Sequence, residues 1–318
     1  MKILVPGAAG FIGSHFVDLL VRARPSDELA VLDALTYAGD IRNLAAHERE
    51  PRFQFVRGDV ADPKIINPLV EWADLVVNFA AESFVDRSIE EAAPFVRTNL
   101  TGTLVLLDAC RTSRTAMVQV STDEVYGSIA QGAFSESSLL APNNPYSATK
   151  AGGDLLCRAY HHTYGMDVRI MRGPNSYGPR QNPEKAIPTF TIAALTRKQL
   201  PIYGDGSNRR EWLYVADFCR AVLTVAEDGE PGEIYNAGGG HELANLELAT
   251  EICRLTGAPE ALITFVEDRP GHDFRYSMVW DRLSALGWKP ETDFGEGLER
   301  TVTWFQQHAE RWPGGLGG

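Results

Sequence analysis

The amino-acid sequence predicts an α/β protein in which a doubly wound parallel sheet carries a smaller, partly discontinuous C-terminal region. Short apolar runs alternate with helical patterns through the first half of the chain, as in sheets whose parallel strands are joined by helices. A glycine-rich turn follows the first apolar run, and Gly- and Pro-rich segments appear after residue 172. We expect a sheet domain over residues 1–172 and a second region over residues 173–318, with a strand near residues 233–238 returning to the sheet.

The composition excludes several classes of protein. Hydrophobic residues make up 44% of the 318, which is ample for a folded core, and no apolar run is long enough to cross a bilayer. The net charge of −12 argues against nucleic acid or an anionic membrane as a partner. The cysteines stand singly without a C-x-x-C pair, so we expect reduced core thiols, no metal site and a cytoplasmic location; they are Cys110, Cys157, Cys219 and Cys253.

The first strand covers residues 2–5, and a helix over residues 14–22 follows it closely. Between them lies a G-x-x-G-x-x-G pattern, whose glycines let the backbone turn sharply and approach a pyrophosphate at the start of the helix. This pattern predicts a dinucleotide-binding loop made of Gly7, Gly10, Phe11, Ile12 and Gly13.

An acidic residue, Asp33, closes the second strand over residues 29–32. A carboxylate at this place accepts hydrogen bonds from an adenosine ribose diol and repels a 2′-phosphate. Together with the glycine loop it predicts a Rossmann-type fold and NAD rather than NADP as the cofactor. The plainer alternative is that Asp33 is only a turn residue at a strand end.

The sheet continues with strands over residues 53–56 and 74–81 and a helix over residues 94–110. The first of these strands runs into Gly58, Asp59 and Val60. The second ends in Ala80 and Ala81, small residues that let a cofactor lie against the backbone.

The most informative stretch follows the strand over residues 117–120. Ser121, Thr122, Asp123 and Glu124 fall where this strand meets a loop, and parallel sheets bind ligands at such strand ends. A helix then begins near Tyr146, with Lys150 one turn further on the same face, where a positive charge would favour the phenolate. An alcohol dehydrogenase needs no extra carboxylates, so the adjacent acids suggest a second proton-transfer pair. Taken singly, each piece is better explained as an ordinary helix face or a solvated turn.

After the strand over residues 168–172, three Gly- and Pro-rich loops bring arginines into an acidic chain. They cover residues 173–185, 203–212 and 268–273. Arg209, Arg210 and Arg269 are candidate diphosphate ligands because guanidinium groups match phosphate oxygens. The alternative, strongest for Arg209, is a surface arginine paired with a nearby acid.

With these residues in view, the chain resembles the extended short-chain dehydrogenase/reductase superfamily, and most closely the dTDP-glucose 4,6-dehydratases. The resemblance covers nearly the whole chain, and the Thr122-Asp123-Glu124 triplet is its most discriminating motif. The other motifs are the glycine loop, residues 35–39, 80–83 and 85–88, Tyr146-x-x-x-Lys150, residues 183–185 and residues 269–273. The chain departs from the family at Phe84, Gly173-Pro174, Ser176 and Arg180, all in or near substrate-facing loops.

The resemblance implies an NAD-dependent lyase that oxidises the sugar of dTDP-glucose at C4, eliminates water across C5 and C6, and returns the hydride to C6. It implies the catalytic residues Thr122, Asp123, Glu124, Tyr146 and Lys150. It implies NAD contacts from the glycine loop and Asp33, with Thr36, Asp59, Val60, Ala80, Ala81, Ser121, Tyr146 and Lys150. It implies sugar-nucleotide contacts from Ser83, Asn175, Glu184, Lys185, Asn208, Arg210, Arg269 and His272.

Two rival functions stay open. An NAD-dependent nucleotide-sugar 4-epimerase shares the glycine loop and the Tyr146/Lys150 pair but does not need Asp123 and Glu124. A non-catalytic NAD-sensing regulator would keep the fold without needing these side chains. The resemblance also suggests a homodimer packed through the helices that begin near Pro94 and Tyr146.

Overall fold

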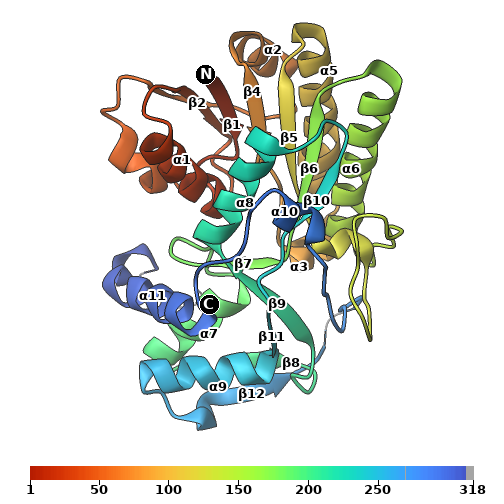
Figure 1. The fold of residues 1–318 in the computed structure, drawn as a ribbon. Coiled ribbons are helices and arrows are strands. Elements are labelled where there is room, and N and C mark those ends of the chain that lie inside the picture. The colour runs from red at the N-terminus through yellow and green to blue at the C-terminus, as the bar shows by residue number, and fades with distance from the viewer. Residues whose placement is uncertain (269, 313–318) are drawn as a thin grey trace.

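The computed structural model describes residues 1–268 and 270–312, and its centre is a parallel sheet of seven strands (Figure 1). The strand order is β10-β6-β5-β4-β1-β2-β3, so the chain winds outward in both directions from the pair β1 and β4. This confirms the predicted doubly wound fold. The strands are β1 (Lys2–Pro6), β2 (Glu28–Asp33), β3 (Phe53–Arg57), β4 (Leu75–Asn78), β5 (Ala116–Thr122), β6 (Val168–Gly173) and β10 (Ile234–Asn236).

Each face of the sheet has its own apolar core because side chains alternate along a strand. On β1, Ile3 and Val5 pack with α1 and α8, whereas Leu4 packs with α2 and α5 on the other face. The helices that cover the sheet are α1 (Phe11–Ala23), α2 (Pro63–Trp72), α5 (Thr103–Ser113), α6 (Pro145–Tyr164) and α8 (Val215–Asp228). Residues 94–110, predicted as one helix, form α4 (Ala93–Phe95), the π-helix η2 (Val96–Gly102) and the start of α5.

The second region lies beyond the carboxyl ends of the sheet strands (Figure 1). It has a core of its own around Ile187, Leu200 and Leu298. Its sheets join β11 (His241–Ala244), β9 (Arg209–Tyr214) and β7 (Asn175–Tyr177), and β12 (Ile263–Val266) with β8 (Leu200–Tyr203). Its helices are α7 (Ala186–Leu195), α9 (Asn245–Thr256) and α11 (Phe294–Gln307). Although β10 comes late in the chain, it pairs in parallel with β6.

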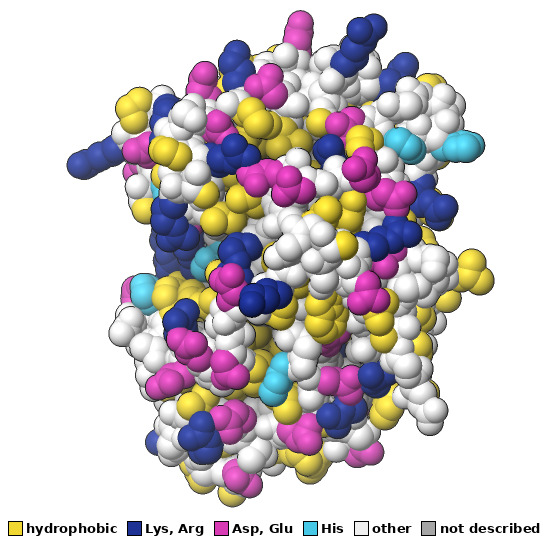
Figure 2. All heavy atoms as spheres, in the orientation of Figure 1, with side chains coloured by type: hydrophobic (Ala, Val, Ile, Leu, Met, Phe, Trp, Pro, Cys, Tyr) yellow, Lys and Arg dark blue, Asp and Glu magenta, His cyan; other side chains and the backbone are white. Residues whose placement is uncertain are grey.

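The remaining elements are short and connect these layers. They are η1 (Ile41–His47), α3 (Val85–Glu90), η3 (Asp123–Tyr126), η4 (Glu260–Leu262), α10 (Asp281–Ala285) and η5 (Ala309–Arg311). Among the described residues, no helix is both long and apolar enough to span a membrane, and no His, Cys, Asp and Glu side chains gather as a metal site. On the face drawn in Figure 2, acidic and basic side chains are interspersed rather than gathered by sign.

Candidate active site

A cavity of about 500 Å³ lies between the carboxyl ends of the sheet strands and the second region. One side is formed by the glycine loop, the end of β5 and the start of α6. The other side is formed by the loop after β6, β9 and the segment that ends at Tyr276. The cavity thus brings together the predicted dinucleotide loop, three residues at or just after the end of β5, namely Ser121, Thr122 and Glu124, and the Tyr146/Lys150 pair.

The glycine loop is held so closely that side chains are excluded from two of its positions. Gly7 has a φ of +78°, and a Cβ there would lie 2.5 Å from the backbone nitrogen of Ala80. A Cβ on Gly13 would lie 2.2 Å from the carbonyl oxygen of Gly7. The first turn of α1 has no side-chain cap at Gly10, so its backbone N–H groups face the cavity and can bind a phosphate.

The buried hydroxyl of Ser121 also lines the cavity, and it forms no hydrogen bond with any described residue. A buried polar group of this kind generally has a partner, which a bound cofactor can supply. The uncapped helix, the backbone cradle and this hydroxyl therefore fit a dinucleotide.

Asp33 ties the glycine loop to the segment that follows β2. Its two carboxylate oxygens accept hydrogen bonds from the backbone N–H of Ala9 at 2.9 Å and of Leu35 at 2.8 Å. Burial raises the pKa of Asp33, and these hydrogen bonds oppose the rise. Each oxygen keeps a lone pair, so the geometry allows both a structural role and a ribose contact.

The other residues predicted to contact the cofactor lie at varied places. Asp59 accepts a hydrogen bond from the backbone of Ala61 and pairs with Arg97 at 2.8 Å, while Val60 is buried beneath Gly102. A hydrogen bond with the Thr36 side chain opposes the rise that burial causes in the pKa of Glu82. Ala81 lines the cavity, but Ala80 does not. Contact of Thr36, Asp59, Val60 and Ala80 with a cofactor stays a prediction.

Tyr146 and Lys150 project from the first turns of α6, which begins with a capping box between Asn144 and Ser147. Both side chains line the cavity, but the Lys150 ammonium donates to the carbonyl of Val120 at 2.7 Å. Burial, followed by the charge of Glu124, raises the pKa of Tyr146, and a hydrogen bond with the Thr122 side chain opposes the rise. That the Lys150 ammonium favours the phenolate stays a prediction.

The Asp123 carboxyl lies in a buried environment that favours its protonated form. Its side chain is 2% exposed, and Thr122 Oγ1 donates to its Oδ1 at 3.1 Å. Burial raises the pKa of Asp123 well above its usual range, and the neighbouring charges of Glu124 and Glu211 raise it further. Burial and these charges thus favour the protonated form of Asp123, which can donate a proton, whereas the neighbouring Glu124 lines the cavity.

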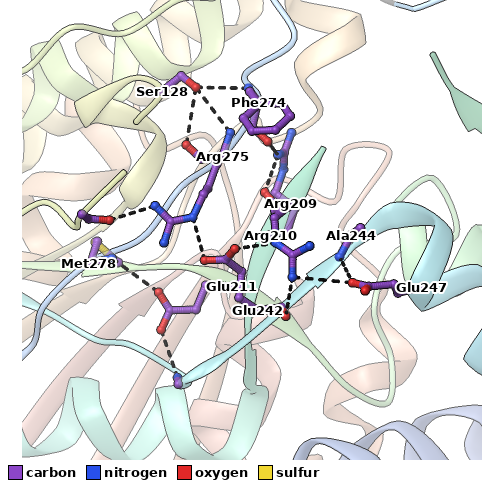
Figure 3. Close-up of polar contacts among 12 residues, drawn as sticks. Ser128, Arg209, Arg210, Glu211, Glu242, Ala244, Glu247, Phe274, Arg275 and Met278 are labelled. Carbon is purple, nitrogen blue, oxygen red and sulfur yellow. Dashed lines mark hydrogen bonds and ion pairs between the residues drawn. The ribbon is translucent and has the colours of Figure 1, made fainter. Parts of the chain in front are cut away.

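Glu211, which sequence reasoning did not single out, is the third carboxyl of this group. It lies on β9 and accepts hydrogen bonds from the backbone of Gly240 at 3.0 Å and of Met278 at 3.4 Å (Figure 3). Burial raises its pKa as well. Asn245 and Tyr276 also line the cavity and were not expected, because neither stands in a motif with recognisable chemistry.

The two arginines at the start of β9 have different surroundings (Figure 3). Arg209 pairs with Glu242 at 2.6 Å and with Glu247 at 3.6 Å, as the surface alternative for this residue expected. Arg210 is 6% exposed, lines the cavity and forms no ion pair within the described part of the chain. Its guanidinium donates to the carbonyls of Arg209, Asp273 and Phe274 at 2.7, 2.9 and 3.2 Å. The guanidinium also lies over the Tyr276 ring, 4.7 Å from its centroid. A buried cation held by carbonyls and an aromatic ring, without a carboxylate partner, suits an anionic ligand.

Most of the other residues predicted to bind the sugar nucleotide also line the cavity. These are Ser83, Asn175, Glu184, Lys185 and His272. Lys185 donates to the carbonyl of Ser83 at 2.6 Å, and Glu184 pairs with Arg87. Asn208 lies behind the cavity wall and donates to the carbonyl of Asp273 at 3.2 Å. Arg269 is outside the described residues.

The unusual residues of the substrate loops have two different settings. The cavity wall includes Phe84, Gly173, Pro174 and Ser176. A Cβ on Gly173 would come within 2.4 Å of the Phe218 ring, so only glycine fits there. Arg180 points elsewhere and pairs with Asp18 on α1.

Comparisons with known proteins identify the family of the chain. The sequence model of the family described as GDP-mannose 4,6 dehydratase matches residues 4–301. A dTDP-glucose 4,6-dehydratase of Actinoplanes sp. is 49% identical over 98% of this chain and 100% of its own length.

The crystal structure of DesIV, a dTDP-glucose 4,6-dehydratase from Streptomyces venezuelae with NAD bound, has a TM-score of 0.96 and 49% identity over 98% of this chain and 99% of that one. A UDP-glucuronic acid 4-epimerase from Bacillus cereus has a TM-score of 0.92 but 31% identity, over 96% and 99%. The chain belongs to the GDP-mannose 4,6 dehydratase family.

Proposed function

We propose that the protein is an NAD-dependent hydro-lyase that converts dTDP-glucose to dTDP-4-keto-6-deoxyglucose. The observation that carries the proposal is the buried Asp123 carboxyl, whose pKa is raised, next to Glu124, which lines the same cavity as Tyr146 and Lys150. A 4-epimerase needs only the second pair, and a regulator needs neither. We assign the cofactor mainly to residues 1–172 together with β10, and the sugar nucleotide mainly to residues 173–318.

Each side chain then has a defined task. When bound, NAD would accept the hydride from C4 and return it to C6. Tyr146 takes the proton of the O4 hydroxyl, with Thr122 as hydrogen-bond partner, once the positive nicotinamide and Lys150 favour the phenolate. The new ketone acidifies the C5 hydrogen, and Glu124 removes that proton. Asp123 gives its proton to the C6 hydroxyl, which leaves as water.

The test is incubation of the purified protein with dTDP-glucose and, separately, UDP-glucose, followed by mass spectrometry of the products. Loss of one water from dTDP-glucose supports the proposal, and a greater rate with UDP-glucose would reassign the nucleotide. An unchanged mass with inverted C4 would make the protein an epimerase. Absence of any product from either substrate would favour the regulator.

We further infer a homodimer that packs through η2, α5 and α6, in the cytoplasm. Large apolar side chains are exposed on these helices, namely Val96, Leu104, Leu155 and Tyr164. Apolar side chains that gather on one surface often mark an interface. All four cysteines are free and buried, which suits a reducing compartment. Sedimentation of the wild type and of a Leu155→Lys variant tests the dimer, and a wild-type monomer would contradict it.

Replacement of Asp33 by Ala should narrow the preference for NAD over NADP, because the carboxylate that repels a 2′-phosphate is lost. The same change removes the hydrogen bonds to Ala9 and Leu35, so we expect weaker binding of both cofactors. Titration of the stripped protein with each cofactor measures both effects. A wild type that prefers NADP, or an unchanged ratio in the variant, would leave Asp33 with a structural role only.

Replacement of Arg210 by Ala should raise the KM for the sugar nucleotide by the equivalent of about 1.5 to 3 kcal/mol, the range for hydrogen bonds to a charged group. Arg209→Ala is the matched control, because Arg209 precedes Arg210 on β9 but pairs with Glu242 and Glu247. Its KM should stay close to that of the wild type. A KM for Arg210→Ala that also stays close to the wild-type value would leave Arg210 with a structural role only.

A further inference from the structure

A chain of buried polar side chains joins the two elements that carry the proposed catalytic groups. Arg172, at the end of β6, is 1% exposed and lies in register with Ser121 of β5 and Asn236 of β10. Its Nε donates to Asp154 Oδ2 on α6 at 2.9 Å, and its Nη1 donates to the Tyr126 hydroxyl on η3 at 2.7 Å. One guanidinium therefore bonds to both α6 and η3.

Each end of this chain lies close in sequence to proposed catalytic residues. On α6, Asp154 follows Lys150 by one turn and, like it, is buried. On η3, Tyr126 closes the same 3₁₀ turn that begins with Asp123 and Glu124. The Tyr126 hydroxyl also donates to Asn236 Oδ1 at 2.8 Å, which extends the chain to β10. A rigid, hydrogen-bonded link of this kind fixes the relative position of what it joins.

Stability alone does not account for such a group. A buried ion pair is weak evidence for stability, because an apolar pair of similar volume often serves as well. The Oδ1 of Asp154 is buried and forms no hydrogen bond with a described residue, whereas Oδ2 accepts from Arg172. The charge of Asp154 also acts on Lys150: burial lowers the pKa of the ammonium, and Asp154 opposes this.

We propose that Asp154 and Arg172 are positioning residues, in which Asp154 keeps Lys150 charged for C4 oxidation and Arg172, through Tyr126, holds Asp123 and Glu124 in place for elimination. The inference rests on the proposed function. It predicts that two substitutions in one buried chain slow two different half-reactions. The loss of general packing would instead slow both alike.

The groups around Lys150 determine the expected pH dependence. Asp154 and Cys157 on α6 raise the pKa of Lys150 against the effect of burial, and the Val120 carbonyl of β5 accepts a hydrogen bond from its ammonium. Cys110 on α5 acts in turn on Cys157, and Arg172 on β6 bonds to Asp154. Tyr146 on α6 and Glu124 on η3 line the same cavity as Lys150, and Asp123 adjoins Glu124. Only Asp154 is both negatively charged and placed to support the ammonium from the same helix. In Asp154→Asn the pKa of Lys150 should fall. The alkaline limb of C4 oxidation should then move to lower pH, by about one unit or more.

The experiment uses the purified holoenzyme and dTDP-glucose in single turnovers, with NADH absorbance for oxidation and mass spectrometry for water loss. Asp154→Asn should slow oxidation by about tenfold or more, with the shifted alkaline limb. Tyr126→Phe, which removes one hydroxyl, should leave oxidation within about twofold but slow elimination by about tenfold, so that bound NADH accumulates. Asp217→Asn is the control, because Asp217 is equally buried and paired with Arg220 at 2.6 Å on α8.

The inference is supported if Asp217→Asn leaves both steps unchanged while Asp154→Asn slows oxidation and Tyr126→Phe slows elimination. Equal slowing of both steps in Tyr126→Phe, or an unshifted alkaline limb in Asp154→Asn, overturns it. If Asp154→Asn does not fold, the ratio of the two steps in Tyr126→Phe decides alone. A wild type that releases a product of unchanged mass would instead refute the proposed function, before any variant is compared.

Discussion

Replacement of Tyr146 by Phe should abolish C4 oxidation, with a loss of about 10³- to 10⁴-fold in kcat, the upper range for a positioned acid or base. The ring keeps its packing against Phe95, because the two centroids lie 6.4 Å apart and only the hydroxyl is removed. Neither transient NADH nor product should form in a single turnover. Substrate binding should remain, because the proposed diphosphate ligand Arg210 lies on β9, apart from α6.

A second tyrosine provides the control for this result. Tyr177 is as deeply buried, and its hydroxyl donates to the carbonyl of Phe294 at 3.1 Å, away from the cavity. Tyr177→Phe should therefore lose some stability but retain oxidation. If Tyr146→Phe still formed NADH at the wild-type rate, another group would have to accept the O4 proton, and the site assignment would be wrong.

Local patterns were sufficient to predict the sheet and its first loop. The strand, glycine turn and helix at residues 2–23 are close in sequence, and their chemistry depends on backbone shape, so spacing alone predicts the result. The same holds for Asp123 and Glu124, which adjoin the end of β5. A strand near residues 233–238 that returns to the sheet was also predicted, and β10 pairs in parallel with β6.

Long-range pairings could not be predicted in this way. Glu211 approaches Asp123 only because β9 folds back beneath the sheet strands, and no motif marks it. Adjacent residues on a strand point to opposite faces, so one residue of register decides that Arg210 enters the cavity and Arg209 does not. Likewise, spacing places Lys150 one turn from Tyr146 on the helix. It does not predict the direction of the ammonium group, which donates a hydrogen bond to the Val120 carbonyl.

The buried Asp123 carboxyl should lower the stability of the folded protein at neutral pH. A raised pKa means that the folded protein holds the Asp123 proton more tightly than the unfolded chain, so this contribution is present at low pH and lost as the pH rises through the folded value. Because asparagine does not ionise, Asp123→Asn does not lose this stability as the pH rises. The variant should melt at a higher temperature than the wild type at neutral pH, and the difference should vanish below about pH 4, where the aspartate is protonated in both states.

Replacement of Asp123 by Asn or Glu124 by Gln should separate oxidation from elimination, because both changes leave the Tyr146 hydroxyl and the Lys150 ammonium in place. The sugar can still be oxidised at C4, so enzyme-bound NADH and a 4-keto-hexose should accumulate while water loss slows by about 10²- to 10⁴-fold. Rapid mixing with NADH absorbance, followed by mass spectrometry of the quenched sugar, measures the two steps in one sample.

Solvent deuterium distinguishes the roles of the two carboxyls. In the wild type and in Asp123→Asn, deuterium should enter C5, because Glu124 can still remove that proton and exchange it. In Glu124→Gln, deuterium should be absent from C5, although the Asp123 carboxyl is still present. Wild-type rates of dehydration in both variants would reduce Asp123 and Glu124 to a turn at the end of β5. Other groups would then have to supply the acid and the base for the elimination.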